Sequence, residues 1–356
     1  MSGSVRPREG LGLRGGYHSP QLDVEVRLNT NESPFPPPAE FLDRLEARLR
    51  KLALNRYPDR GYGAVREALA ERLGVMPGQL FCANGSNEVL LMLALGFGGS
   101  GRRSLVFEPT YSLHHHIASL VGGEVLTRLR DEDYRIVLDD EIRRTLSEMD
   151  VVYLCSPNNP TGIVESASVI EEVLACAGNL VVIDEAYSDF ARSSRLPTNA
   201  LAANVVSVRT FSKWYSLAGL RFGYAVSSPA IVDVLDEVVL PYHFDQVKQA
   251  AVLAALELSD LFDERAAALA RLRTALAAEL RALGVSVTDS ETNFMLLSFP
   301  GRDPEVIWRA LVDRSILLRN TAGWPHLPPS LRVTVGTKEE NARLVEALAE
   351  LLADGR

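Results

Sequence analysis

The sequence predicts an α/β fold built around an open, mostly parallel sheet. From about residue 79 to residue 220, short apolar runs alternate with stretches of helical periodicity, the pattern of repeated strand–helix–strand units. The runs at 151–154 and 181–183 are nearly continuous in large apolar residues, as expected for strands buried on both faces. After about residue 245 the pattern changes to a long helix followed by mixed strands and helices, so we expect a second, smaller α+β unit.

The expected elements of the larger unit follow in chain order. Apolar residues at helical spacing predict helices over 39–54 and 64–73. The apolar runs predict buried strands at 79–83, 104–108, 151–155, 180–184 and 205–209. The segments between them predict helices at 87–97, 111–121, 166–176 and 216–220. Because helices separate consecutive strands, we expect most neighbouring strands to run parallel.

The C-terminal part begins with a long helical stretch at about 246–283, dense in Ala, Leu and Arg. The elements expected after it are strands at 285–287, 294–298, 316–319 and 331–335 and helices at 304–313 and 338–353. A chain of 356 residues is long enough for two domains. We therefore expect an N-terminal arm (1–28), a large domain (29–250) and a small C-terminal domain (251–356).

Charge and cysteine content argue against several classes of protein. A net charge of −9 argues against a general nucleic-acid surface, although locally gathered arginines can still bind small anions. The longest apolar run, 89–97, is too short to cross a bilayer, and residues 1–16 lack the apolar stretch of a secretory signal. Cys82, Cys155 and Cys176 are widely separated and fit no metal-ligand spacing, which suits a reducing compartment. We therefore expect a cytoplasmic protein with neither a membrane nor a nucleic-acid partner.

Lys213 is an unusual residue for this chain. Of the 37 basic residues only four are lysines, and Lys213 lies just beyond the predicted strand 205–209, among hydroxyl side chains. Arginine stays charged at neutral pH, whereas a desolvated lysine can act as a nucleophile or carry a proton. A surface lysine is the alternative interpretation. Polar residues that follow the neighbouring strands favour a functional site, because ligands bind at that edge of open α/β sheets.

Two of these neighbouring segments suit a charged ligand. Asp184 directly follows the apolar run 180–183, where a carboxylate is costly unless a cation or a strong donor meets it. The loop 156–162 places Asn158 and Asn159 between two prolines, which fix the backbone and orient an amide rigidly. Tyr111 follows the strand 104–108 and adds an aromatic ring, for which core packing is the alternative.

An anion site is predicted at the same edge of the sheet. The small-residue turn 84–88 opens a helix, whose first backbone N–H groups can bind an anion, although an ordinary capped helix would have a similar sequence. Thr210, Ser212 and Arg221 supply two hydroxyls and a guanidinium, which suit a phosphate dianion. A reactive lysine, a carboxylate and a phosphate site are together what pyridoxal phosphate requires.

On these residues, the chain resembles the fold-type I pyridoxal-phosphate aminotransferases of class II, and more narrowly the histidinol-phosphate aminotransferase family. The resemblance extends from about Tyr17 to the C-terminus, and its motifs follow the family's order. They are Leu28–Pro34, Arg56–Pro58, Gly85–Glu88, Pro157–Gly162, Asp184–Tyr187, Arg209–Lys213, Ala218–Tyr224 and Leu331–Arg332. The resemblance implies the family's three-layer fold, a large domain with a smaller C-terminal domain, and pyridoxal 5′-phosphate as cofactor.

The resemblance also implies roles for individual residues. Lys213 would bind the cofactor covalently and then carry the proton once the amino substrate has released it. Asp184 would face the ring nitrogen, Tyr111 would stack on the ring, and Asn159 and Tyr187 would hydrogen-bond the ring oxygen. The residues implied for the phosphate are Ser86, Asn87, Thr210, Ser212, Arg221 and, from the neighbouring subunit of a homodimer with shared active sites, Tyr57.

The implied activity is transamination between L-histidinol phosphate and 2-oxoglutarate, in histidine biosynthesis. The implied substrate-binding residues are Tyr17, Asn31, Tyr242, Arg319 and Arg332. An aromatic amino-acid aminotransferase is the nearest alternative, and a decarboxylase of a phosphorylated amino acid such as threonine phosphate is a more distant one. A cofactor-binding regulator would need a DNA-binding segment, and the short arm before residue 28 has no helix-turn-helix pattern.

Two departures from the family pattern stand out. Ser216 occupies a position where the family usually has glycine, so the conformation of the loop beside the phosphate site could differ from the family's. His114, His115 and His116 are consecutive, but on a helix they point in three directions and cannot chelate one metal ion together. We therefore expect no metal site, with a contact between one of these histidines and the substrate ring as an alternative role.

Overall fold

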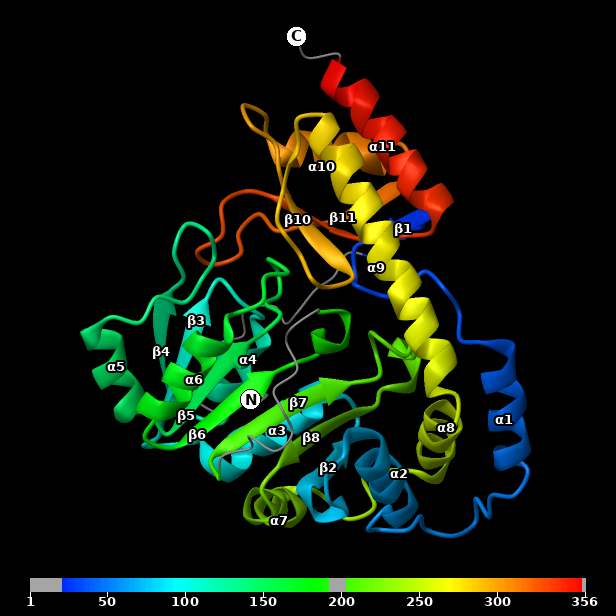
Figure 1. The fold of residues 1–356 in the computed structure, drawn as a ribbon, viewed down its shortest axis with the longest axis vertical. Helices are drawn as coiled ribbons and strands as arrows, with labels where there is room; N and C mark the ends of the chain where they lie inside the picture. Colours follow the sequence, from blue (N-terminus) through cyan, green and yellow to red (C-terminus); the bar gives the residue numbers. More distant parts are fainter. Residues whose placement is uncertain (1–20, 192–202, 354–356) are drawn as a thin grey trace, which may run out of the picture.

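The computed structural model describes residues 21–191 and 203–353, and a seven-stranded sheet forms its larger part (Figure 1). In spatial order the strands are β2 (Leu80–Ala83), β8 (Gly223–Ser227), β7 (Val205–Thr210), β6 (Leu180–Asp184), β5 (Val151–Cys155), β3 (Arg103–Glu108) and β4 (Glu124–Leu129). All neighbours from β7 to β4 are parallel, whereas β8 runs antiparallel to both β2 and β7. The predicted α/β fold with a mostly parallel sheet is confirmed.

The parallel register brings the ends of several strands together. Asp184, the last residue of β6, is paired with Cys155, the last residue of β5, and with Val208 of β7. Thr210 ends β7 two residues later. Polar side chains at or just beyond these ends are therefore gathered at one edge of the sheet, where ligands bind in open α/β folds.

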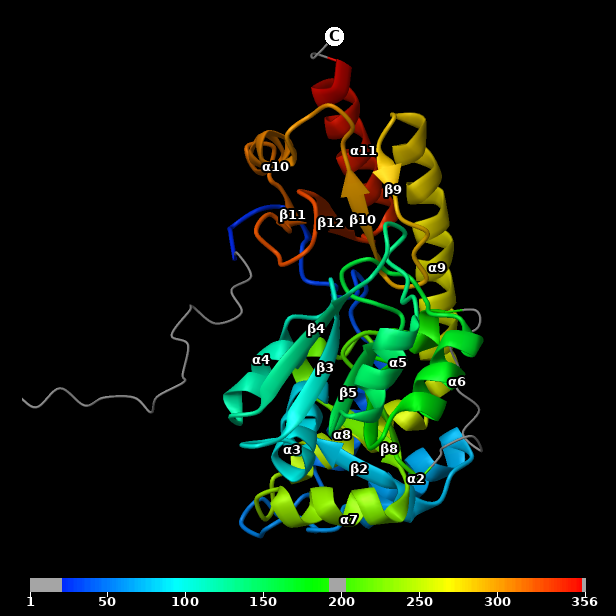
Figure 2. The ribbon, with the colours of Figure 1, turned by 90° about the vertical axis from the view of Figure 1, so that its left-hand side faces the viewer.

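Helices cover both faces of this sheet (Figure 2). The helices on one face are α3 (Ser86–Phe97), α4 (Leu113–Leu120) and α7 (Pro229–Val238), and those on the other are α2 (Gly63–Leu73), α5 (Asp140–Ser147), α6 (Ala167–Cys176) and α8 (Gln246–Leu256), with α1 (Ala39–Leu49) against α8. Side chains alternate between the faces: Val182 packs on the α3 side, whereas Val181 and Ile183 pack on the α6 side. Because both faces are covered, the strands read as continuous apolar runs.

A second, five-stranded sheet forms the C-terminal part of the fold. Its strands, in spatial order, are β1 (Val26–Leu28), β11 (Ile316–Asn320), β12 (Leu331–Thr334), β10 (Phe294–Ser298) and β9 (Ser286–Val287). The helices that pack on it are α9 (Ser259–Ala282), α10 (Pro304–Val312) and α11 (Lys338–Ala353). Tyr187 and Phe190, from the segment after β6, are buried in the same apolar core, so the two sheets are joined next to the end of β6.

Several elements differ from those expected. β4, β8, α5 and α7 were not expected, since β4 is a partly exposed edge strand of mixed polarity and β8 begins with glycine and ends with serine. The helical stretch 246–283 is two helices, α8 and α9, which are separated at Glu257 and Leu258. Residues 26–28, expected in the arm, form a strand that pairs with β11. Across the described ranges, no helix is long and apolar enough to span a bilayer.

Candidate active site

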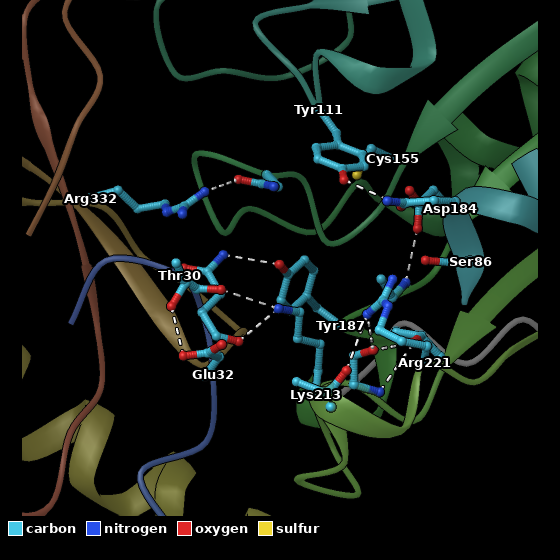
Figure 3. Close-up of a pocket in the computed structure, with 18 residues that line it drawn as sticks. Thr30, Glu32, Ser86, Tyr111, Cys155, Asp184, Tyr187, Lys213, Arg221 and Arg332 are labelled. Atoms are coloured by element: carbon cyan, nitrogen blue, oxygen red, sulfur yellow. Dashed lines mark hydrogen bonds between the residues drawn. The ribbon is translucent and has the colours of Figure 1, made fainter. Parts of the chain in front are cut away.

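A cavity of about 380 Å³ lies between the two sheets, at the edge where β5, β6 and β7 end. Most of the site residues expected from the sequence line this cavity: Asn31, Ser86, Asn87, Tyr111, Asn159, Asp184, Tyr187, Thr210, Ser212, Lys213, Arg221 and Arg332. Figure 3 shows Arg332, Thr30 and Glu32 on one side of the cavity, Ser86, Asp184 and Arg221 on the other, and Lys213 with Tyr187 between them. Tyr57, Tyr242 and Arg319 do not line it, and Tyr17 lies outside the described residues.

The amine of Lys213 is held by backbone carbonyls of the segment that follows β1. Its Nζ lies 2.8 Å from the carbonyl oxygen of Asn31 and 3.4 Å from that of Thr30. Burial, with further contributions from the positive charges of Arg332 and Arg221, lowers the pKa of Lys213 to about 7. Glu32 opposes this shift without cancelling it. A lysine with such a pKa is partly neutral at physiological pH, as a nucleophile and proton carrier must be.

Asp184 has the strong donor that its buried position requires. Nε2 of His114 lies 2.9 Å from Oδ2 of Asp184, and both side chains are buried. The backbone N–H of Ala186 donates to the other carboxylate oxygen at 3.1 Å. An ionised carboxylate only accepts, so Nε2 carries the hydrogen. His114 stacks on Tyr153 with the ring centroids 5.5 Å apart, which orients the imidazole toward Asp184.

The sequence did not indicate His114 as a partner of Asp184. His114 is the buried member of the histidine triplet on α4, whereas His115 and His116 are exposed. The signal that could have found it is the helical spacing from Tyr111, which lines the cavity and packs perpendicular to the His114 ring with the ring centroids 5.6 Å apart. Among the residues that the structure describes, no group of three or more potential ligands could hold a metal ion.

Two polar side chains link the segments on opposite sides of the cavity. The hydroxyl of Tyr187 accepts a hydrogen bond from Nδ2 of Asn31 at 2.9 Å, and burial raises the pKa of Tyr187, so the phenol stays protonated. Arg332 on β12 donates to Oδ1 of Asn159 at 2.6 Å, which joins the small sheet to the rigid loop after β5. Both links place polar groups of the two sheets within one cavity.

The end of the cavity near α3 has the form of an anion site. A Cβ added at Gly85, whose φ is 91°, would lie 2.7 Å from Nη2 of Arg221, and one added at Gly223 would lie 2.2 Å from the backbone N of Ser86. Two glycines thus let the backbone and a guanidinium approach closely. Nη1 of Arg221 donates to Oγ of Ser212 at 3.3 Å, and α3 begins here at Ser86. A helix N-terminus, a hydroxyl and an arginine converge, as phosphate binding requires.

Arg319 and Arg332 face each other on neighbouring strands. They are paired in the antiparallel register of β11 and β12, and both are buried. Each guanidinium also lies over the ring of Trp324, at 5.6 Å and 5.7 Å from its centroid. Nothing in the sequence indicated Trp324, because it lies in the connection between the two strands. The result is a positive region that opens into the cavity through Arg332.

Tyr57 and Tyr242 form an aromatic pair outside the cavity. Their rings are stacked with the centroids 4.5 Å apart, and the residues are 79% and 43% exposed. Leu54 and Leu240, from the same two segments, are also exposed. This part of the chain therefore presents apolar side chains to solvent rather than to its own cavity.

The family model and the similar proteins of known sequence all indicate one family. The model of the family "Aminotransferase class I and II" matches residues 24–348. A histidinol-phosphate aminotransferase of Thermobifida fusca is 42% identical, with 98% of this chain and 95% of that protein covered. One of Corynebacterium glutamicum is 38% identical, with 97% and 96% covered.

Solved structures agree with this similarity. The histidinol-phosphate aminotransferase of Sinorhizobium meliloti, in complex with pyridoxal 5′-phosphate, has a TM-score of 0.84 at 26% identity and covers 93% of this chain and 91% of its own. An L-threonine-O-3-phosphate decarboxylase of Porphyromonas gingivalis has a TM-score of 0.82 at 24% identity, with 92% and 100% covered. The second likeness concerns the fold alone.

Proposed function

Because this chain belongs to the class I and II aminotransferase family, we propose that it is a pyridoxal-phosphate-dependent aminotransferase which exchanges an amino group between L-histidinol phosphate and 2-oxoglutarate, in histidine biosynthesis. The observation that carries the proposal is near-full-length identity of about 40% to histidinol-phosphate aminotransferases. The chemistry of the cavity supports it independently.

Three features of the cavity fit pyridoxal phosphate. Lys213 is an amine with a pKa of about 7, Asp184 is a buried carboxylate, and the glycine-lined region around Arg221 suits the phosphate. When bound, the cofactor supplies an electron-accepting ring that stabilises the charge left on the substrate carbon when its proton departs. The residues proposed to hold the phosphate are Ser86, Asn87, Thr210, Ser212 and Arg221.

The chain's own residues divide the work around that ring. Lys213 would anchor the cofactor and, once its amine is free, would accept the proton from the substrate carbon and deliver it to the cofactor carbon to which the amine was attached. Asp184, oriented by His114, would face the ring nitrogen and keep it protonated. Tyr187 and Asn159 would hydrogen-bond the ring oxygen and Tyr111 would stack on the ring face, and all three line the cavity.

The substrate end of the cavity favours a dianion. Arg332 lines the cavity, and Arg319 faces it across the strand pair. Two buried like charges on adjacent strands repel each other, so a ligand with two negative charges stabilises them more than one with a single charge. This favours a phosphorylated amino substrate over phenylalanine for the forward half-reaction. The same arginines can grip a carboxylate of glutamate bidentately in the second half-reaction.

Glu32 favours an imidazole on the amino substrate. Glu32 and Asp184 are the carboxylates that line the cavity, and Oε2 of Glu32 accepts a hydrogen bond from the hydroxyl of Thr30 at 2.8 Å. A carboxylate at this position can accept from an imidazole N–H, whereas a phenyl ring offers it no donor. The proposed arrangement puts the substrate phosphate near Arg332 and the ring near Glu32.

We also propose that the enzyme is a cytoplasmic homodimer with shared active sites. Tyr57 is exposed to solvent and does not line the cavity of its own chain. A second copy of the chain would cover the exposed apolar side chains of Leu54, Tyr57, Leu240 and Tyr242. Cys82 and Cys155 are buried free thiols, which suits a reducing compartment.

A panel of amino donors tests the proposed function. The cofactor-loaded enzyme is mixed with histidinol phosphate, phenylalanine or threonine phosphate, and conversion of the cofactor to its amine form is followed by absorbance. Histidinol phosphate should have the highest kcat/KM by more than about tenfold, roughly 1.4 kcal/mol in transition-state binding. A preference for phenylalanine of that size would contradict the substrate, and carbon dioxide release from threonine phosphate would contradict the reaction.

Glu32→Gln refines the same panel. Because Glu32 is exposed and lines the cavity, the variant should raise the KM for histidinol phosphate by roughly threefold relative to the KM for phenylalanine. Any effect through the pKa of Lys213 is common to both substrates. Glu40→Gln, on the exposed first turn of α1, is the matched control and should leave the KM of both substrates unchanged. An equal change in the two KM values would show that Glu32 does not distinguish the imidazole ring from the phenyl ring.

A further inference from the structure

The carbonyl groups of Thr30 and Asn31 form a docking position for the free amine of Lys213. The two oxygens lie 3.4 Å and 2.8 Å from Nζ. A neutral amine has two N–H bonds and one lone pair, so donation to both carbonyls leaves the lone pair directed away from them. The lone pair is what accepts a proton, and its direction therefore matters to any proton transfer that Lys213 performs.

The Asn31 carbonyl is itself fixed by residues of the small sheet. Nδ2 of Asn293 donates to this oxygen at 3.1 Å, in addition to Lys213. The backbone N–H of Asn31 donates to Oγ1 of Thr334 at 2.9 Å, and that hydroxyl lies 3.3 Å from Oδ1 of Asn31. Asn31 has a φ of 55°, a left-handed conformation that needs such support in a non-glycine residue.

Asn293 is rigidly placed for this contact. The residue is fully buried, and its backbone oxygen accepts from the N–H of Val335 at 2.9 Å, just beyond β12. The guanidinium of Arg273 donates to the carbonyl of the preceding residue, Thr292, at 2.7 Å. These two contacts fix the backbone that carries the carboxamide, whose Nδ2 donates to the Asn31 carbonyl. Asn293 does not line the cavity itself, so we expect it to act there through Asn31.

We propose that Asn293 is a positioning residue for the amine of Lys213, which acts by holding the Asn31 carbonyl in place throughout the catalytic cycle. When Lys213 is engaged elsewhere in the cycle, the carbonyl keeps one donor in Asn293 and does not need to rearrange. When the amine is released, it returns to the same position with its lone pair already oriented. The inference deepens the proposed function and rests on it for the timing of release, but the docking contact exists without substrate.

Nuclear magnetic resonance of the cofactor-free protein tests the docking directly. With selectively 13C-labelled lysine, four lysine signals are expected, and Lys213→Arg assigns the one of interest. The two ε-protons of an immobilised lysine have different chemical shifts, which rotation averages to one. The wild-type Lys213 signal should be split and should merge in Asn293→Ala. A split signal that persists in Asn293→Ala would overturn the proposal.

Asn341→Ala is the matched control for loss of a buried carboxamide. Asn341 is buried, and its side chain bonds the backbone of Gly336 in the same small domain, away from Lys213. Both alanine variants should lose similar stability in thermal unfolding, while Asn341→Ala keeps the split signal. If Asn293→Ala does not fold, Thr334→Val tests the same chain of contacts, since it removes the acceptor for the Asn31 N–H with little change in volume.

Steady-state kinetics of the loaded enzyme add a second readout. Asn293→Ala should lower kcat for histidinol phosphate by about tenfold with little change in KM and should increase the isotope effect of an α-deuterated substrate, because proton transfer becomes slower. Asn341→Ala should change neither. Equal losses in both variants would show a structural role only and contradict the inference. Failure of the substrate panel together with merging of the Lys213 signal would refute the proposed function while the docking stands.

Discussion

Oδ2 of Asp184 and Nε2 of His114 lie 2.9 Å apart, buried between the large sheet and helix α4. The contact joins the carboxylate at the end of β6 to an imidazole that packs on Tyr153 from the face opposite α6. His114 therefore orients the carboxylate of Asp184 from the α4 side of the sheet, while Asp184 also lines the cavity. A carboxylate held this way can face a cationic ring nitrogen without reorganisation.

Replacement of His114 tests this orientation. His114→Phe keeps the aromatic packing on Tyr153 but removes the hydrogen bond to Asp184. A hydrogen bond to a charged group contributes about 1.5–3 kcal/mol, so kcat/KM should fall by roughly ten- to a hundredfold and cofactor release should become faster. His115→Phe, on the exposed side of α4, is the control and should have wild-type kinetics. Equal kinetics for His114→Phe and wild type would exclude the role.

The pKa of Lys213 predicts a pH dependence of stability in the cofactor-free protein. The folded pKa is about 7, and the unfolded value is the ordinary 10.5. Between these values the unfolded chain binds more protons than the folded one, so stability should rise with pH from about 7 to about 10.5. Below pH 7 the folded protein holds Lys213 as a buried ammonium, and the full cost of that burial lowers the free energy of unfolding.

The measurement compares thermal unfolding of wild type and Lys213→Met across pH 6 to 10. Subtraction of the Lys213→Met curve removes the other titrating groups, which the two proteins share. The difference in midpoint should favour Lys213→Met most at low pH and shrink as the pH rises through the window above 7. A difference that does not depend on pH would show that Lys213 has an ordinary pKa.

Ser216 shows why the family position favours glycine. Its φ is 54°, in the left-handed region, where a side chain costs about 1–2 kcal/mol. Ser216→Gly relieves this strain but adds unfolded-state entropy, so the free energy of unfolding should rise by on the order of 0.5 kcal/mol. Ser228→Gly, at a φ of −64°, has no strain to relieve and should be destabilising. Denaturant unfolding that places both variants below wild type would contradict this explanation.

Mixed dimers test the proposed sharing of active sites. Lys213→Ala and Tyr57→Ala subunits, combined after joint unfolding and refolding, form dimers in which one site combines both substitutions and the other has neither, if Tyr57 serves the partner's cavity. The mixture should recover about a quarter of wild-type activity, above the sum of the parents. Activity that never exceeds that sum would place Tyr57 outside any shared site.

The sequence predicted those site residues that follow strands directly. Asp184 ends β6 and Lys213 lies three residues beyond β7, so parallel pairing alone brings them to one edge. His114 could not be assigned in this way, because its contact depends on how α4 packs on the sheet. Asn31 was expected to bind substrate, and its contacts with Tyr187 and Lys213 became visible only when β1 paired with β11 across the length of the chain.

The same physical reason explains the elements that were missed. β4 lacks an apolar run because it is a partly exposed edge strand, and β8 is stabilised by pairing with β2 and β7 rather than by its own sequence. The break between α8 and α9 has no glycine or proline to mark it. Each of these features depends on tertiary context, which overrides local propensity.

The most direct test of the account is the identity of the lysine that binds the cofactor. The full-length protein is loaded with pyridoxal 5′-phosphate and treated with borohydride, which converts the cofactor–lysine linkage into a stable secondary amine, and the modified peptide is mapped by mass spectrometry. We predict modification of Lys213 alone among the four lysines of the chain. Modification of Lys51, Lys248 or Lys338 in its place, or no modification at all, would contradict it.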